Sequence, residues 1–208
     1  MTVLWKVCGL RYHPKWHDLR PEHDLIDSGF GADSRDQFLH GITDGPGGTC
    51  GTIPFLIAAI GRRLKYPLYV VKAKNHLFAR WSDPHGLWRG LSGVSPSRPT
   101  RFNVEATNPG LQTPSDDEYR EWPKPIHPYL IECGAYLSPL MPPEEIAESL
   151  SARSACLGKA GRVDEDLECR RWAAALAPHN PVKLECFEWL ERKAAERRPI
   201  VSRSLVGR

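Results

Sequence analysis

A cysteine beside a predicted helix is the residue in this chain best suited to nucleophilic chemistry. Cys50 follows Gly47-Gly48-Thr49 and precedes the apolar run 55–60. Pro54 fits only the first turn of a helix, so we expect the helix to begin near Thr49 or Cys50. A helix N-terminus stabilises a thiolate, the reactive form of cysteine. The segment alone leaves open the alternative of a small buried cysteine that packs as a hydrophobic residue.

A histidine and a glutamate on predicted strands provide partners for such a thiol. The sequence pattern predicts strands over 68–71, 76–81 and 101–107. His76 opens the second strand, and Glu105 lies on the polar face of the third, because strand side chains have a period of two. If these two strands pair, His76 and Glu105 can meet on one face. The polar insertion 82–100 fixes no register, so the sequence permits this contact without requiring it.

These residue types are the components of a cysteine acyl-transfer site. A thiol paired with an imidazole forms a thiolate–imidazolium pair, and a carboxylate orients the imidazole. Attack on an amide or ester carbonyl then gives a thioester, which water or an amine cleaves. The backbone N–H of Cys50 would be one oxyanion donor; Gln37 and a backbone amide near Gly47 are candidates for the second.

Three further residues near the predicted site are candidates for binding substrate. Asn75 and Trp81 flank His76 along the chain, and Asn103 shares the face of Glu105. We expect these three residues to line a cleft. The alternative is that Trp81 belongs to the core and both asparagines belong to turns or to the sheet surface.

The combination of segments resembles the transglutaminase-like superfamily, a branch of the papain-like cysteine enzymes, and within it a bacterial subgroup whose members are mostly uncharacterised. The resemblance covers roughly residues 38–160 and rests on the segments 48–50, 59–64, 76–81, 102–107 and 116–123. It implies an α+β fold in which a nucleophile helix packs on an antiparallel sheet. It also implies that Cys50 is the nucleophile, His76 the general base and acid, and Glu105 the orienting residue. Most members have an aspartate where this chain has Glu105.

The chain is expected to divide into a transglutaminase-like domain over 1–135, a helical segment over 136–198 and a disordered tail over 199–208. The helical segment should contain three helices, from Pro142 to about 158, over 164–177, and from Asn180-Pro181 toward 197. Part of it resembles the second half of a tetratricopeptide repeat. One degenerate repeat cannot form a peptide-binding groove, so we expect it to pack on the first domain. Docking of a protein partner is the alternative.

Composition narrows the classes of function. The net charge of +3 does not call for nucleic acid, and no apolar stretch is long enough to span a membrane. The N-terminus lacks the features of an export signal, so a cytoplasmic protein with six reduced cysteines is expected. A metal site at Cys8, His13, His17 and His23 is disfavoured by Pro14. No metal or other cofactor is expected.

Two classes of function therefore remain open at this stage. The first is a cysteine hydrolase or acyltransferase that acts on an amide or peptide-type bond in a peptide or protein substrate. The second is a non-catalytic relative that keeps the fold as a binding or scaffolding module. The insertion 82–100 could form a lid over the cleft or a disordered excursion, and the sequence does not decide between them.

Overall fold

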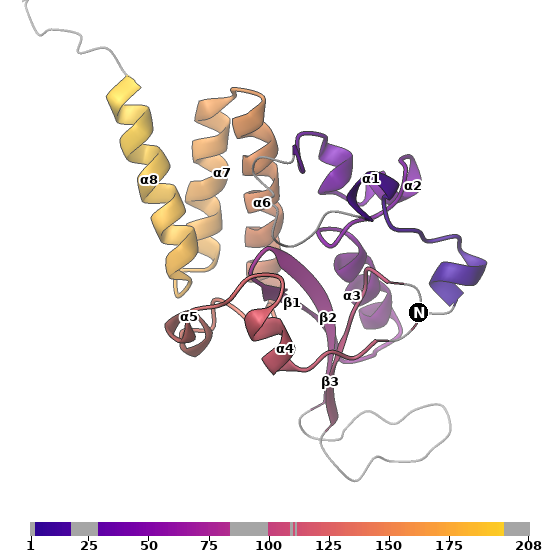
Figure 1. The fold of residues 1–208 in the computed structure, drawn as a ribbon. Coiled ribbons are helices and arrows are strands. Elements are labelled where there is room, and N and C mark those ends of the chain that lie inside the picture. Colours follow the sequence, from indigo (N-terminus) through magenta and orange to yellow (C-terminus); the bar gives the residue numbers. More distant parts are fainter. Residues whose placement is uncertain (1–2, 18–28, 84–99, 109, 111, 198–208) are drawn as a thin grey trace, which may run out of the picture.

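The computed structural model describes residues 3–17, 29–83, 100–108, 110 and 112–197 and has an α+β fold (Figure 1). The tail predicted over 199–208 and residues 84–99 of the insertion lie outside the described residues. A three-stranded antiparallel sheet occupies the centre. Within the described residues, no helix has the length and apolar character that a membrane crossing requires.

The sheet has the strand order β1-β2-β3, and its strands are Leu68–Ala73, His76–Asp83 and Thr100–Val104. Ala79 on the central strand pairs with Val70 on one side and with Val104 on the other. The three predicted strands are therefore confirmed, although β3 ends earlier than 107. Glu105 continues only as a single bridge to Gln112. The second and third strands, whose pairing the sequence left open, are paired despite the long insertion.

Helix α3, Ile53–Arg63, packs on this sheet through Ile53 and Ile57, which share a buried cluster with Ala79 and Val104. The helix begins at Ile53, so the predicted start near Thr49 or Cys50 is wrong by about one turn. The backbone of Thr52, with φ −123°, departs from helical geometry, so residues 49–52 form a separate turn before the helix. Within this turn the N–H of Thr49 donates to Oγ1 of Thr52 at 2.7 Å.

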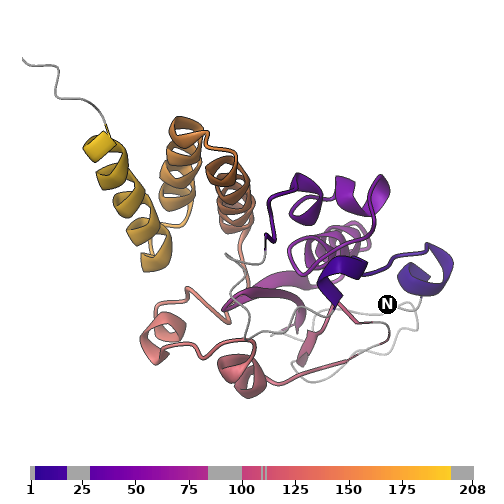
Figure 2. The same ribbon diagram turned by 45° about the horizontal axis from the view of Figure 1, so that its top comes forward.

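The C-terminal segment is a row of three helices beside the sheet, with α6 closest to it (Figure 2). They are α6 (Pro142–Lys159), α7 (Val163–Leu176) and α8 (Pro181–Arg197), which confirms the three predicted helices. Ala147 and Ala173 are buried together between α6 and α7. The segment also contacts the first part of the chain, because Lys72 on β1 forms an ion pair with Glu148 on α6.

Short helices complete the described structure. They are the π-turn Val3–Val7, α1 (Pro14–His17), the 3-10 turn Ser34–Asp36, α2 (His40–Thr43), α4 (Asp116–Glu121) and α5 (Pro128–Glu132). Helix α4 begins at a capping box, in which Ser115 and Glu118 satisfy each other's backbone N–H groups. This cap fixes the start of the helix that carries Tyr119, a buried residue next to the site described below.

Candidate active site

Cys50 lies in the turn that leads into α3. The carbonyl of Thr49 accepts the N–H groups of Thr52 and Ile53, at 3.1 and 3.0 Å, and Oγ1 of Thr49 accepts the N–H of Gly51 at 3.1 Å. These bonds fix the backbone on both sides of Cys50. The cysteine residue is half-buried. The turn therefore presents a thiol at the N-terminal end of a helix.

The structure brings His76 and Glu105 together beside this thiol. Nε2 of His76 lies 2.9 Å from Oε2 of Glu105, and both side chains are buried. The Cys50 side chain also lies close enough to His76 to raise the pKa of the imidazole. Because Nε2 faces the carboxylate, Nδ1 is the ring nitrogen left for the thiol. The three residues predicted to converge are thus adjacent.

The surroundings of the pair favour its charged forms. Burial lowers the pKa of His76, but hydrogen bonds and charges of Cys50 and Glu105 outweigh burial and raise it to about 9. Burial raises the pKa of Glu105, but the hydrogen bond and charge of His76, together with Thr107 and Tyr119, lower it to about 2. An imidazolium next to a carboxylate is therefore the stable arrangement at neutral pH.

These shifts predict a pH window for the contribution of the pair to stability. Glu105 stabilises the fold above its ordinary pKa of 4.5 and loses this contribution as the pH falls through about 2. His76 stabilises the fold below its ordinary pKa of 6.5 and loses this contribution as the pH rises through about 9. The coupling free energy from a double-mutant cycle of His76→Asn and Glu105→Gln, measured by urea unfolding, should therefore be largest between pH 4.5 and 6.5. A coupling that is the same at all pH values would contradict this expectation.

Four donors hold the Glu105 carboxylate in place. Oε2 accepts a hydrogen bond from Oη of Tyr119 at 2.7 Å in addition to the contact with His76. Oε1 accepts the backbone N–H and the hydroxyl of Thr107, at 2.9 and 2.6 Å. Each oxygen therefore has two partners. The longer glutamate, at a position where the resemblance implies aspartate, is fixed by bonds at both of its oxygens.

Aromatic rings pack around His76. Tyr119 stacks on Phe78 with ring centroids 3.9 Å apart, and the edge of Trp122 meets His76 at a centroid distance of 4.9 Å. Sequence reasoning gave no role to Tyr119 or Trp122, although the segment 116–123 contributed to the resemblance. The role of Thr107 could have been found from the sequence, because the alternation along the third predicted strand places Thr107 on the same face as Glu105.

Tyr12, another residue that the sequence did not indicate, lies against Cys50. Its segment bridges to Gly48, whose N–H donates to the carbonyl of Arg11 at 2.9 Å. Gly47 allows this approach, because a Cβ there would lie 2.7 Å from the same carbonyl. The side chain of Tyr12 lies close to Cys50, and burial and the charge of Cys50 raise the pKa of Tyr12.

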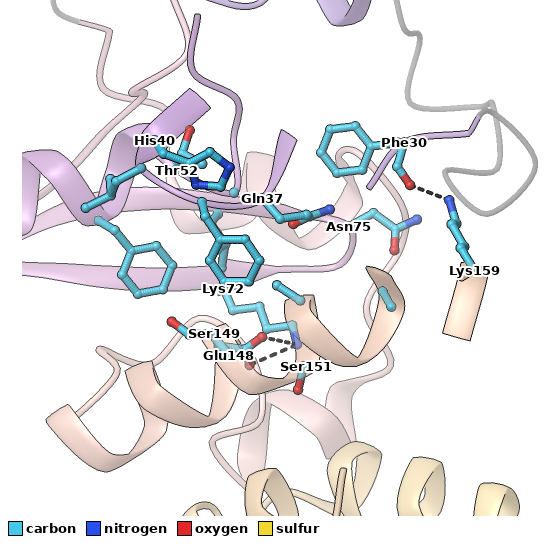
Figure 3. Close-up of a pocket in the computed structure, with 17 residues that line it drawn as sticks. Phe30, Gln37, His40, Thr52, Lys72, Asn75, Glu148, Ser149, Ser151 and Lys159 are labelled. Carbon is cyan, nitrogen blue, oxygen red and sulfur yellow. Dashed lines mark hydrogen bonds and ion pairs between the residues drawn. The ribbon is translucent and has the colours of Figure 1, made fainter. Parts of the chain in front are cut away.

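Of the three residues expected to line a cleft, Asn75 borders a pocket that also reaches Gly51 (Figure 3). Trp81 does not line this pocket and stacks on Phe102, with ring centroids 5.9 Å apart. Asn103 is buried and does not line it either. Its Oδ1 accepts Nε of Arg80 at 2.7 Å, and this bond ties β2 to β3. Trp81 and Asn103 thus make structural contacts within the sheet, in keeping with the alternative interpretation that they belong to the core or the sheet surface.

Gln37 lines the same pocket and lies next to the turn of the nucleophile. A Cβ at Gly51 would be 3.1 Å from Oε1 of Gln37, so the side-chain amide lies beside the residue that follows Cys50. Figure 3 shows the amide of Gln37 on the same side of the pocket as Asn75. Gln37, one of the two candidates for the second oxyanion donor, therefore lies near Cys50, but its oxygen faces Gly51 and its Nε2 faces Gly31.

Neither the metal-ligating side chains among the described residues nor the comparisons with known proteins assign a further role to this site. The described residues contain no group of three or more His, Cys, Asp or Glu side chains that could hold a metal ion, and His23 lies outside them. No family model matches the chain, and no match was found among curated proteins or solved structures.

Proposed function

We propose that this protein is a transglutaminase-like cysteine hydrolase or acyltransferase that acts on an amide or peptide-type bond. The observation that carries the proposal is the contact of three side chains that are distant in sequence. The half-buried thiol of Cys50 meets His76, which in turn lies 2.9 Å from a carboxylate oxygen of Glu105. A raised imidazole pKa and a fully bonded carboxylate are what a thiolate–imidazolium pair requires.

In the proposed reaction, Cys50 and His76 begin as a thiolate–imidazolium pair with the thiol proton already on Nδ1 of His76, and the sulfur attacks the substrate carbonyl carbon. The N–H of Cys50 stabilises the oxyanion, and the amide of Gln37 is the second donor once the amide has rotated to turn its Nε2 toward the substrate. His76 then protonates the leaving nitrogen as the carbon–nitrogen bond breaks, which leaves a thioester. Water or an amine gives a proton to His76, attacks the thioester and releases the thiol.

A binding or scaffolding role is the second candidate, and exposed tryptophans support it. Trp172 on α7 and Trp189 on α8 are each about half exposed, at 50% and 52%. Large aromatic side chains are enriched at protein interfaces. The helical segment would then be the docking surface, and Cys50 would have ordinary thiol chemistry.

Alkylation by iodoacetamide discriminates between the two candidates. A thiol with the ordinary pKa near 8.5 is about 1% thiolate at about pH 6.5, so a thiolate–imidazolium pair reacts up to ~10²-fold faster there. We expect Cys50 to be modified faster than the other five cysteines at this pH, and His76→Ala to remove most of the difference. Peptide mapping by mass spectrometry gives the rate at each cysteine.

A matched control keeps this test specific. His179→Ala removes an exposed histidine that pairs with Glu144 on α6, and it should leave the Cys50 rate unchanged. If all six cysteines react at similar rates, with the pH dependence of a free thiol, the scaffold is favoured over the enzyme.

A further inference from the structure

A pocket of about 730 Å³ lies between the first part of the chain and α6, and Cys50 and His76 do not themselves line it. It reaches Gly51 and Asn75, the chain neighbours of the nucleophile and of the base. Three phenylalanines, Phe30, Phe38 and Phe55, contribute to its walls. The pocket thus reaches the residues next to the reacting groups in the chain and offers aromatic surface to a ligand.

Positively charged side chains outnumber negatively charged ones in the lining of this pocket. The residues that line it include Lys72, Lys159 and Glu148, two cations and one carboxylate. Both oxygens of Glu148 lie 3.0 Å from Nζ of Lys72, and Oε1 also lies 2.9 Å from Nζ of Lys183 (Figure 3 shows the contacts with Lys72). This carboxylate already faces two ammonium groups, so it has little capacity left for a cationic ligand.

Lys159 is the cation best placed to meet a ligand. It is exposed at the C-terminal end of α6, and its ammonium donates to the carbonyl of Phe30 across the pocket mouth (Figure 3). A carbonyl oxygen takes one of its three donors and does not neutralise its charge. Lys159 therefore adds to the excess positive charge of Lys72 and Lys183 over Glu148.

We propose that this pocket binds the part of the substrate next to the scissile amide, and that this part is an aromatic or apolar group that carries a carboxylate. The inference rests on the proposed function, because it takes Cys50 as the reacting group. The phenylalanines would cover the apolar body, and Lys159 would pair with the carboxylate. The charge excess disfavours a cationic group at the same place.

Reactive probes that differ only in the aromatic ring and the carboxylate test the proposal. N-iodoacetyl-phenylalanine carries both groups, N-iodoacetyl-phenylalanine amide lacks the carboxylate, and N-iodoacetylglycine lacks the ring. We expect the phenylalanine probe to alkylate Cys50 about tenfold faster than either of the others. N-iodoacetyl-aspartic acid anilide, with its carboxylate on a side chain, shows which source of carboxylate fits better.

Substitution of the cation completes the design. Lys159→Gln should remove the advantage of the phenylalanine probe over its amide, whereas Lys193→Gln, an exposed lysine on α8, should preserve it. Equal rates for acid and amide in the native chain would overturn the pocket assignment, as would an advantage that survives Lys159→Gln.

The failure of the pocket assignment is separable from that of the proposed function. If simple iodoacetamide already shows no preference for Cys50, the enzyme proposal fails and this inference fails with it. If iodoacetamide selects Cys50 but the four probes react alike, the nucleophile stands and only the carboxylate pocket is wrong.

Discussion

Replacement of Glu105 by glutamine should slow acylation of Cys50 by about 10²–10⁴-fold, the range typical of positioned acid–base groups. The burst of p-nitrophenol released from p-nitrophenyl acetate measures this rate, and mass spectrometry locates the acetyl group. Cys50→Ala gives the background. The loss is expected even though glutamine nearly matches glutamate in size, because the carboxylate is surrounded by donors.

The direction of these donors decides the outcome. The backbone N–H of Thr107 points at Oε1 of Glu105 and cannot become an acceptor, so a glutamine must keep its oxygen there. Its amino group then faces His76 and Tyr119, where Oε2 now accepts. A donor at Nε2 of His76 places the ring proton on Nδ1, which can then no longer accept the thiol proton.

Two neighbouring variants show whether this explanation holds. Tyr119→Phe removes one donor and keeps the charge, so a much smaller loss, about tenfold or less, is expected. His127→Ala, at the exposed N-cap of α5, should change nothing. An acylation rate of Glu105→Gln close to that of the native chain would show that Glu105 does not orient His76.

Local patterns in the sequence predict most of this fold. The period of two around Val104 and Glu105 gives a strand, and prolines at 142 and 181 mark helix starts that the structure reproduces. The predicted start of α3 is too early, because the backbone of Thr52, with φ −123°, interrupts the helix after Cys50. A backbone irregularity of this kind leaves no signature in hydrophobic periodicity.

Only the three central residues of the candidate site were predictable from the sequence. Cys50, His76 and Glu105 follow from residue type and from the period of the strands, whereas their contact depended on a register that no local rule fixes. Tyr12 comes to Cys50 through a bridge between distant segments, and Tyr119 through the packing of α4. Neither tyrosine lies in a sequence pattern that indicates its position in the site, because only the chain topology brings it there.

Loss of the Glu148 carboxylate should produce the largest change in stability, about 3–5 kcal/mol for Glu148→Ala, which is typical of breaking a buried ion pair. Glu148 on α6 contacts Lys72 on β1 and Lys183 on α8, and its side chain is 9% exposed. Burial alone would raise the pKa of Glu148, but the two lysines lower it. Without it, two ammonium groups would face each other among three packed elements. Urea unfolding measures the difference.

A comparison of three variants separates charge from packing in this cluster. Glu188→Ala removes the carboxylate of an exposed pair with Arg192 on α8, so it should cost no more than about 1 kcal/mol. The triple variant Lys72→Met, Glu148→Leu and Lys183→Met removes every charge while keeping similar volume, and it should recover most of the loss. If the triple variant is as unstable as Glu148→Ala, the unpaired lysines are not the cause of the loss. If they are the cause, Glu148→Gln, which removes the charge and keeps the volume, should lose nearly as much stability as Glu148→Ala.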